Sequence, residues 1–368
     1  MRKILFHLNS LSRGGTERVT VTLANYFAEA GMDVAVSTLW PDEHEYSLHH
    51  SVRRIHVGWT EADGKSGRLG KLRLNVRRIR ALIHAEKPDV VIAMNREANY
   101  RTLAAAARGF KGTIVPVIIS VRYVAQIQYG AVLDRLVQAL LLPRMAGMVF
   151  QTQEQQAFFP RRIQKKSCVI LNPLDKKFMD APLPTTRKAE IVHASRLEAR
   201  KNQAAIVRAF IRIHADYPDY TLTIYGGDSG DGTQQALADI IAAYDAAAYV
   251  RLAGASKKLE EEMKAAAMFV FNSDSEGLPN ALMEAMALGL PVISSDCMGG
   301  GAKALIKDGI NGLLIPMQDE AALEQAMRRL LADPEFAESL GCEARKINEI
   351  CNVETIAGQW LDHIEGIL

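Results

Sequence analysis

Short apolar runs alternate with helical patterns along the whole chain, and this alternation constrains the fold more than any other feature. In the first half we predict strands near residues 3–8, 33–39, 52–57, 89–94, 113–119, 147–151 and 168–171, and helices near 16–30, 69–86, 97–108 and 129–142. In the second half we predict strands near 190–194, 220–225, 249–252, 268–272, 291–295 and 313–315, and helices near 320–332, 334–350 and 354–367. Several runs are almost continuously apolar, as in parallel sheets covered on both faces. The pattern predicts two doubly wound α/β domains with a ligand at the carboxyl ends of the strands.

The chain is long enough to form two domains with separate cores. It has 368 residues, of which 48% are apolar and 23% charged, as is ordinary for a globular protein. A loose stretch that begins at Asn172-Pro173 marks the expected boundary. We therefore expect an amino-terminal domain over residues 1–172 and a carboxyl-terminal domain over residues 173–353.

The cysteines and the lengths of the apolar runs indicate a compartment. Cys168, Cys297, Cys342 and Cys351 form no Cys-x-x-Cys motif, so we expect neither a disulfide framework nor a zinc site. No apolar run approaches the ~18 residues that a membrane-spanning helix needs. We interpret the amino terminus as a strand, because polar residues interrupt its apolar stretch too early for a signal peptide. These features predict a cytoplasmic protein.

The net charge of +2 hides a strong asymmetry between the halves. Residues 1–175 carry 25 Lys and Arg against 14 Asp and Glu, a net charge of +11, whereas residues 176–368 have a net charge of −9. A basic first half suits an anionic membrane surface, a pyrophosphate-linked lipid or nucleic acid. No motif for binding RNA or DNA accompanies the charge, so we favour the membrane or lipid and expect no nucleic acid.

One helical stretch in the basic half combines an apolar stripe with flanking cations. The stripe has helical spacing and consists of Leu72, Val76, Ile79 and Ile83. The cations, which we predict to bind anionic lipid, are Lys71, Arg73, Arg77, Arg78 and Arg80. An outer helix whose stripe packs on its own sheet is the alternative, but it explains the run of cations less well. Residues 133–142 are a second candidate for a lipid-facing helix, but a helix buried between the sheet and solvent is the favoured interpretation of that stretch.

Two carboxylates flank a predicted helix start in the second half. Glu276 follows the apolar run 268–272, and Glu284 lies eight residues later in the expected helix that begins near Pro279. The amino end of a helix presents unpaired N–H groups and partial positive charge, which suit a phosphate. Acids around an anion site indicate a ligand with both phosphate and hydroxyl groups, such as a sugar nucleotide. Two exposed acids near a helix start are the alternative.

Two further loops follow predicted strands in the same half. Arg196 and Lys201 lie where residues 190–194 give way to a helix, for which Asn202 is the predicted N-cap. A guanidinium and an ammonium in this position suit a diphosphate. Gly226 and Gly227 follow the strand near 220–225, where they allow a close approach of the backbone to a ligand.

In combination, these motifs resemble glycosyltransferase family 4. The resemblance rests on Arg196-Leu197 with Lys201-Asn202, on the glycine pair, on the run from Glu276 to Glu284, and on the loop Gly14-Gly15-Thr16-Glu17-Arg18. It covers essentially the whole chain. It implies retaining, metal-independent enzymes with the GT-B fold, in which two Rossmann-like domains face a central cleft. One departure is Ser195, where the family usually has Gly. The resemblance also implies that residues 354–368 cross back onto the first domain.

The resemblance assigns roles to individual residues. Arg196 and Lys201 neutralise the departing diphosphate, Glu276 binds hydroxyls of the transferred sugar, and Glu284 binds the ribose. The donor-binding backbone is assigned to Gly14, Gly15, Gly226, Gly227, Leu278, Pro279 and Asn280. On the acceptor side, Arg122 and Asn95 follow strands of the first domain, and for Arg122 a surface residue without a ligand is an equal alternative. His7 and His193 lie within predicted strands, so we expect them to be structural.

The resemblance therefore implies a retaining glycosyltransferase that needs no metal and no cofactor. It would move a sugar from a UDP-sugar to a lipid-linked, lipopolysaccharide or other glycan acceptor, on the cytoplasmic face of the inner membrane. A nucleotide-sugar epimerase of related fold and a non-catalytic sugar-nucleotide-binding protein are the alternatives. A nicotinamide-dependent enzyme is disfavoured, because Gly14-Gly15 is no Gly-x-Gly-x-x-Gly.

Overall fold

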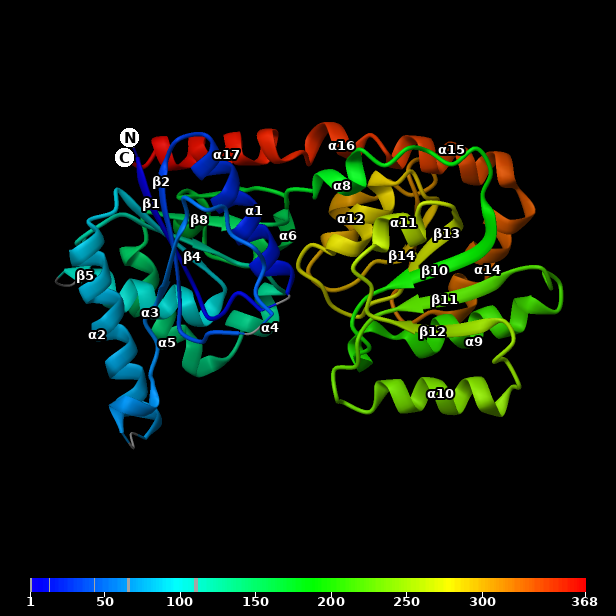
Figure 1. Ribbon diagram of the computed structural model, residues 1–368, viewed down its shortest axis with the longest axis horizontal. Coiled ribbons are helices and arrows are strands. Elements are labelled where there is room, and N and C mark those ends of the chain that lie inside the picture. Colours follow the sequence, from blue (N-terminus) through cyan, green and yellow to red (C-terminus); the bar gives the residue numbers. More distant parts are fainter. Residues whose placement is uncertain (1, 13, 43, 65–66, 109–111) are drawn as a thin grey trace. The chain divides into compact units, whose positions relative to one another are not determined.

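The structure is a computed structural model that describes residues 2–12, 14–42, 44–64, 67–108 and 112–368 (Figure 1). The chain divides into two compact units. Unit 1 comprises Met1–Pro173 together with Val353–Leu368, and unit 2 comprises Leu174–Asn352. The carboxyl-terminal segment thus belongs to the first unit.

Unit 1 is built on a seven-stranded parallel sheet in the order β3-β2-β1-β4-β7-β8-β9. Its strands are β1 (Lys3–Leu8), β2 (Asp33–Thr38), β3 (Arg53–His56), β4 (Val90–Met94), β7 (Val117–Ser120), β8 (Gly147–Phe150) and β9 (Ser167–Val169). The helices are α1 (Gly15–Glu29), α2 (Arg68–Glu86), α3 (Arg96–Ala106), α4 (Ala125–Tyr129), α5 (Val132–Leu141), α6 (Gln153–Ala157), α7 (Arg161–Gln164) and α17 (Val353–Glu365). Two single 3₁₀ turns, η1 (Glu61–Asp63) and η2 (Leu142–Arg144), and a short antiparallel pair, β5 (Ala107–Arg108) with β6 (Gly112–Thr113), complete the unit.

Both faces of this sheet are covered by helices, which explains the continuous apolar runs of its strands. In β4 alternate side chains join different cores: Ile92 packs with residues of α1 and α17, and Val91 packs with residues of α2 and α3. Phe27 of α1 and Trp360 of α17 are fully buried in the first of these cores. The last helix is therefore an integral layer of unit 1.

Unit 2 has a six-stranded parallel sheet in the order β12-β11-β10-β13-β14-β15. Its strands are β10 (Lys188–Ala194), β11 (Thr221–Tyr225), β12 (Val250–Gly254), β13 (Ala266–Phe271), β14 (Val292–Ser295) and β15 (Leu313–Ile315). The helices are α8 (Lys176–Met179), α9 (Gln203–His214), α10 (Thr233–Ala243), α11 (Leu259–Met263), α12 (Asn280–Ala287), α13 (Gly301–Leu305), α14 (Glu320–Ala332), α15 (Pro334–Ala344) and α16 (Ile347–Ile350), with one 3₁₀ turn, η3 (Ala199–Lys201).

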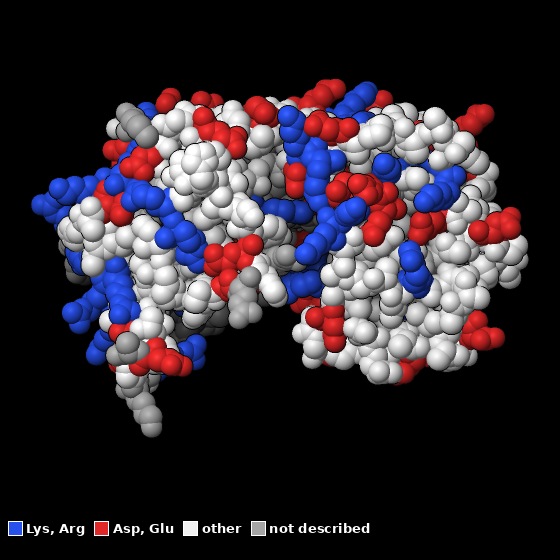
Figure 2. All heavy atoms as spheres, viewed as in Figure 1, with Lys and Arg blue, Asp and Glu red and all other residues white. Residues whose placement is uncertain are grey.

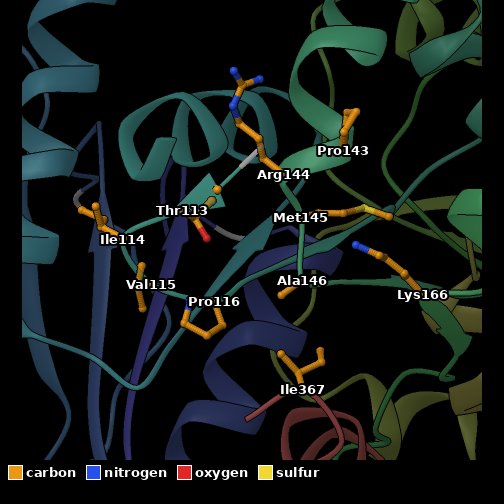
Figure 3. A pocket seen from close by; sticks show the side chains of 11 residues that line it. Thr113, Ile114, Val115, Pro116, Pro143, Arg144, Met145, Ala146, Lys166 and Ile367 are labelled. Atoms are coloured by element: carbon orange, nitrogen blue, oxygen red, sulfur yellow. The ribbon is translucent and has the colours of Figure 1, made fainter. Parts of the chain in front are cut away.

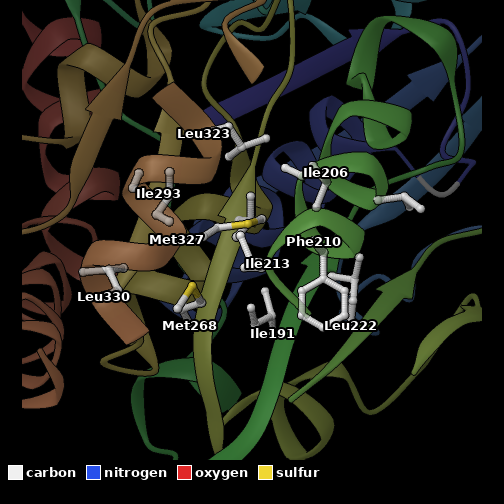
Figure 4. Close-up of a cluster of buried hydrophobic side chains, with 14 of the residues drawn as sticks. Ile191, Ile206, Phe210, Ile213, Leu222, Met268, Ile293, Leu323, Met327 and Leu330 are labelled. Atoms are coloured by element: carbon white, nitrogen blue, oxygen red, sulfur yellow. The ribbon is translucent and has the colours of Figure 1, made fainter. Parts of the chain in front are cut away.

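The main core of unit 2 lies between the sheet and two helices. Figure 4 shows Phe210 of α9, Met327 of α14, Ile191 of β10 and Met268 of β13, which belong to one cluster of buried side chains. All four side chains are buried. This packing fixes the carboxyl edge of the sheet, where the loops after β10, β11 and β13 carry the predicted ligand-binding residues.

The predicted α/β class and the doubly wound arrangement are confirmed, whereas three element boundaries were wrong. Of the strand expected over 113–119, only the part that forms β7 belongs to this sheet. Pro116 precedes β7, and residues 112–113 pair with β5 instead. The helix expected over 129–142 is divided between α4 and α5, with Gly130 at the end of α4. The helix expected over 334–350 ends at Ala344 and is followed by the separate α16. Among the described helices, none is long and apolar enough to cross a bilayer.

Candidate active site

Glu276 lies on the loop after β13, and this loop contacts the loop after the neighbouring strand β14. The Glu276 backbone N–H donates to the Met298 carbonyl at 3.0 Å, and Ser275 forms an isolated parallel bridge with Met298. The Glu276 side chain is buried, with 8% of the residue exposed. Its carboxylate is therefore held within the protein at the edge of the sheet.

Three donors converge on one oxygen of this carboxylate. Lys201 Nζ, Arg200 Nη1 at 3.1 Å and Ser273 Oγ at 2.7 Å all donate to Glu276 Oε1. All three of these hydrogen bonds go to Oε1 and none of them to Oε2. Positive charge and hydrogen bonds thus fix one oxygen, and the second oxygen is available to accept from a ligand hydroxyl.

Lys201 is buried at the end of η3 and lies between Glu276 and an aromatic ring. Burial lowers the pKa of Lys201, the adjacent Arg200 lowers it further, and the Glu276 carboxylate opposes both effects. Its Nζ atom also lies 5.4 Å from the centre of the Phe271 ring. The structure therefore brings Lys201 and Glu276 together as one buried ion pair.

Arg200 is a site residue that the sequence-based assignment missed. Besides Glu276, its guanidinium donates to the Ser275 carbonyl at 2.8 Å, and its own carbonyl accepts from the Asp274 N–H at 2.8 Å. It thereby ties the loop after β10 to the loop after β13. The sequence signal was its place beside Lys201 in a basic run, but nothing in that run distinguishes a residue that faces inward from one that faces solvent.

Arg196 and Asn202 differ from their neighbours in exposure and conformation. The Arg196 side chain is exposed, and its Nη2 atom lies 3.7 Å from Glu198 Oε2. Asn202 occupies the N-cap position of α9, as predicted, but in a left-handed conformation (φ +50°) and without a side-chain hydrogen bond to the helix. Arg196 is consequently the exposed cation of this loop, and Lys201 is the buried one.

A buried network holds the backbone at Ser195, the position where the chain departs from the family pattern. His193 Nδ1 donates to the Val270 carbonyl at 2.8 Å, so its Nε2 accepts from Ser195 Oγ at 2.7 Å. Gln203 Nε2 donates both to Ser195 Oγ at 3.0 Å and to the Arg196 carbonyl at 2.8 Å. Burial lowers the pKa of His193 to about 4, so the ring is neutral near pH 7. His193 thus has a structural role, as expected: its hydrogen bond to Ser195 helps to hold the loop that carries Arg196.

The glycine pair after β11 allows two loops to touch. A Cβ atom on Gly226 would lie 1.7 Å from the Ser195 carbonyl oxygen, and the residue has a φ of +159°. The Gly227 carbonyl accepts from the Leu197 N–H at 2.9 Å. These glycines therefore permit the close approach of the loops after β10 and β11. Contact of Gly226 and Gly227 with the sugar-nucleotide donor stays a prediction.

The amino end of α12 is crowded by a second glycine contact. Pro279 is the N-cap, so α12 begins at Asn280, one residue later than expected. A Cβ atom on Gly301 would lie 2.2 Å from the Gly277 carbonyl and 2.8 Å from Pro279 Cδ. Leu278 and Pro279 are buried, and Asn280 is half-buried. The loop before α12 is consequently held tightly against α13.

Glu284 lies in the second turn of α12 and is buried, with 4% exposure. The backbone of α12 thus places a second buried carboxylate on the helix that follows Glu276. Its assignment to the ribose stays a prediction.

In unit 1 the predicted acceptor-side residues follow the carboxyl ends of β7 and β4. Arg122 is buried rather than on the surface, and Asn172 Oδ1 accepts from both Arg122 Nη2 at 2.7 Å and Gln151 Nε2 at 2.8 Å. Burial lowers the pKa of Arg122 to about 10, and the charge of Glu17 opposes that effect. Asn95 caps α3: it has a φ of +83°, and its side chain accepts from the Ala98 N–H.

The glycine loop of unit 1 lies at the start of α1. Gly14 is the N-cap and Gly15 the first residue of the helix. A Cβ atom on Gly14 would lie 2.2 Å from Glu17 Oε2, so the absence of a side chain lets this carboxylate approach the helix end. Donor contact by these two glycines stays a prediction.

The basic residues of α2 fall into two groups. Arg73 and Arg77 are exposed, whereas Arg78 pairs with Asp63 at 2.6 Å. Arg80 donates to the Ala107 carbonyl at 2.9 Å, and Lys71 lies 3.8 Å from the centre of the Trp59 ring. Figure 2 shows Lys and Arg side chains gathered over the region of α2. Lipid binding by the five residues stays a prediction.

A separate cavity of about 310 Å³ lies at the amino ends of β7, β8 and β9 (Figure 3). The segments that precede these strands line it, together with Ile367. It therefore lies at the edge of the unit 1 sheet opposite to Arg122 and Asn95.

The described residues contain no group of three or more His, Cys, Asp or Glu side chains placed to hold a metal ion.

Two family models match this chain in adjoining segments. Residues 13–178 match the model for glycosyltransferase family 4, and residues 175–347 match the model for glycosyl transferases group 1. Both models describe glycosyltransferases, and between them they account for both units.

Individual proteins are similar over different lengths. The Campylobacter jejuni GalNAc-alpha-(1->4)-GalNAc-alpha-(1->3)-diNAcBac-PP-undecaprenol alpha-1,4-N-acetyl-D-galactosaminyltransferase is 24% identical over 370 residues, which cover 100% of this chain and 99% of that protein. The exopolysaccharide phosphotransferase SCO2592 of Streptomyces coelicolor is 28% identical over 226 residues, which are 60% of this chain and 23% of that protein.

A solved structure extends the likeness to the whole fold. Anabaena HepE, solved in complex with UDP and glucose, matches with a TM-score of 0.82 and 19% sequence identity over 100% of both chains. HepE is a glycosyltransferase with the GT-B fold. The predicted GT-B fold is therefore confirmed.

Proposed function

Because this chain is a glycosyltransferase of the GT-B type, we propose that it transfers a sugar from a UDP-sugar to a lipid-linked or polysaccharide acceptor. The UDP and glucose bound to HepE support the donor. The name of the Campylobacter jejuni relative, which specifies a glycan on PP-undecaprenol, supports a lipid-linked acceptor. The transferred unit in this proposal is a hexose or an N-acetylhexosamine, and the anomeric configuration is retained.

The observation that carries this proposal is the unequal use of the two Glu276 oxygens. Oε1 takes all three donors from the protein, and Oε2 accepts a hydroxyl of the transferred sugar. A carboxylate that is fixed before the ligand arrives positions the anomeric carbon without reorganising. Glu284 on α12 accepts from the ribose hydroxyls.

The leaving diphosphate gathers negative charge as the glycosidic bond breaks. Arg196 contributes an exposed guanidinium, Lys201 a buried ammonium, and the N–H groups around Leu278 and Asn280 add partial positive charge. Fixed cations of this kind replace a metal ion in the proposed mechanism. With no enzymatic nucleophile assigned, we propose front-face substitution, in which the departing phosphate oxygen helps to take the acceptor proton.

The acceptor and the membrane are assigned to unit 1. Arg122 and Asn95 lie at the carboxyl edge of its sheet and contact the acceptor, and Gly14 with Gly15 approaches the donor diphosphate. The exposed cations of α2 attract the enzyme to the anionic cytoplasmic face of the inner membrane. The full set proposed for this contact is Lys71, Arg73, Arg77, Arg78 and Arg80.

Binding and turnover test the proposal separately. Ligand-detected NMR with a panel of nucleotide sugars should show saturable binding of UDP-sugars, and UDP release should require a glycan or lipid-linked acceptor. Glu276→Gln should lower kcat/KM by about 100-fold or more, since one oxygen that binds the sugar is replaced by an amide nitrogen. Glu338→Gln is the matched control, because the Glu338 side chain is exposed and its ion-pair partner is Arg187, which has no assigned role in the site.

Four results would contradict the proposal. Normal turnover of Glu276→Gln would show that Glu276 does not bind the transferred sugar. Interconversion of the donor sugar without any acceptor would indicate an epimerase, and binding without turnover on every acceptor would indicate a sensor. Loss of activity with EDTA, restored by a divalent metal, would contradict the metal-independent mechanism.

A further inference from the structure

Helix α5 presents its apolar side chains to solvent. Val132, Leu136 and Leu140 recur every four residues and so lie along one face of the helix. They are 77%, 73% and 56% exposed. Ile127 of α4, five residues before α5 begins, is also exposed. The exposed stripe of Val132, Leu136 and Leu140 is called the α5 face below.

The opposite side of α5 is polar and tied to the rest of unit 1. Asp134 is 5% exposed and accepts from Arg96 Nη2 at 2.6 Å and from Arg96 Nε at 3.1 Å. Gln138, one turn later, donates to the Tyr129 carbonyl at 2.7 Å. An ordinary surface helix has the reverse arrangement, with apolar residues inside and polar residues outside. Two polar anchors therefore fix the α5 face outward.

The core beneath α5 does not need the exposed leucines. Among the described side chains of α5, only Leu141 packs against the adjacent hydrophobic core, and it does so partly buried. Helix α2 behaves in the opposite way, since Ile79 and Ile83 of its apolar stripe are buried in that core. Exposed apolar stripes of this length on a folded unit mark a surface that another apolar phase covers.

The charge of the chain segment that contains α5 favours a lipid bilayer as the covering phase. In the sequence, residues 125–166 carry six Lys and Arg against two acids, and one of these acids is the buried, ion-paired Asp134. Arg135, next to the stripe on the helix, is exposed and can reach lipid phosphates while its stem lies along the acyl chains. An apolar stripe bordered by cations fits the interface of an anionic bilayer.

We infer that the α5 face inserts into the interface of an anionic lipid bilayer and anchors unit 1 there. This inference rests on the proposed lipid-linked acceptor, because a membrane-bound acceptor gives the anchor its use. In this inference the apolar side chains that enter the bilayer belong to α5 and not to α2, whose apolar stripe is largely buried. The cations of α2 then contribute to membrane binding only through electrostatic attraction.

Vesicle flotation of the full-length chain tests the inference. The vesicles are phosphatidylcholine alone or phosphatidylcholine mixed with phosphatidylglycerol. The wild type should float with the mixed vesicles, and Leu136→Glu/Leu140→Glu should reduce the bound fraction about tenfold or more. The single change Ile310→Glu, at an exposed apolar residue of unit 2, is the matched control and should float like the wild type.

Further measurements separate the outcomes. Because both leucines are exposed, the double variant should keep the wild-type melting temperature and UDP binding. Unchanged flotation of the double variant, or no flotation of the wild type, would overturn the inference. A wild-type dimer in sedimentation that becomes monomeric in the double variant, without lipid binding, would assign the α5 face to a second copy and overturn it as well. Flotation without any nucleotide-sugar binding would instead contradict the proposed function.

Discussion

Replacing Lys201 by Met tests whether the buried ion pair is as tightly coupled as its geometry indicates. The side chains of Lys201 and Glu276 are each 10% exposed, and they are in direct contact. Removing one partner of a buried pair costs about 3–5 kcal/mol, because the remaining charge stays buried without its counterion. Arg200 and Ser273 still donate to Glu276 in this variant, so we expect a loss near the lower end of that range, about 3 kcal/mol.

Calorimetry should detect this loss of free energy as a lower melting temperature. For a unit of the size of Leu174–Asn352, 1 kcal/mol shifts the melting temperature by about 2–4 °C, so Lys201→Met should lower it by about 6–12 °C. Lys346→Met is the matched control, since Lys346 pairs with Glu343 at 2.7 Å with side chains that are 62% and 43% exposed. Water screens this exposed pair, so Lys346→Met should shift the melting temperature much less than Lys201→Met does.

Equal shifts for the two variants would refute this reasoning. They would mean that Lys201 is solvated in solution and that Glu276 is not held by it. A large shift in Lys201→Met combined with unchanged UDP-sugar turnover would confirm the energetics but would separate the pair from the chemistry.

Two other predictions concern the loops around the same site. Gly301→Ala should impair UDP-sugar binding measured by calorimetry, because its Cβ would lie 2.2 Å from the Gly277 carbonyl, whereas Gly358→Ala, with open space around it, should bind normally. The free energy of unfolding of unit 2 should fall as the pH is lowered from 6.5 toward 4, because the unfolded chain protonates His193 in this window and the native ring, with its pKa lowered to about 4, does not. The contribution lost at pH 5 is about 2 kcal/mol, and urea titrations at pH 7 and pH 5 should show it in the wild type but not in His193→Gln.

The fold could be predicted from the sequence because burial on both faces of a parallel sheet leaves a strong pattern. The five residues of β4 are all buried and all apolar, and the strand was placed within a residue of its observed start. Boundaries set by local geometry were harder to predict. Gly130 interrupts the helical pattern between α4 and α5, and the first turn of α12 is displaced by Pro279 acting as N-cap.

The site was predictable in its residue types but not in its pairings. The sequence identified Glu276 and Lys201 because both follow apolar strands, where ligands bind in such sheets. It could not show that the two meet, since the contact joins residues 75 positions apart. The inward orientation of Asp134 on α5 was missed for a similar reason, because its partner Arg96 lies on another helix.

The burial of Lys201 with Glu276 is itself an argument for function. A buried ion pair is a poor source of stability, because a well-packed apolar pair of similar volume is often neutral or stabilising by about 1–4 kcal/mol. The double variant Lys201→Met/Glu276→Leu should therefore melt near or above the wild-type temperature, although Lys201→Met melts lower. If the pair is retained to hold a sugar hydroxyl, the double variant should bind and turn over no UDP-sugar despite its stability. A stable double variant with wild-type turnover would show that the pair is not part of the catalytic site.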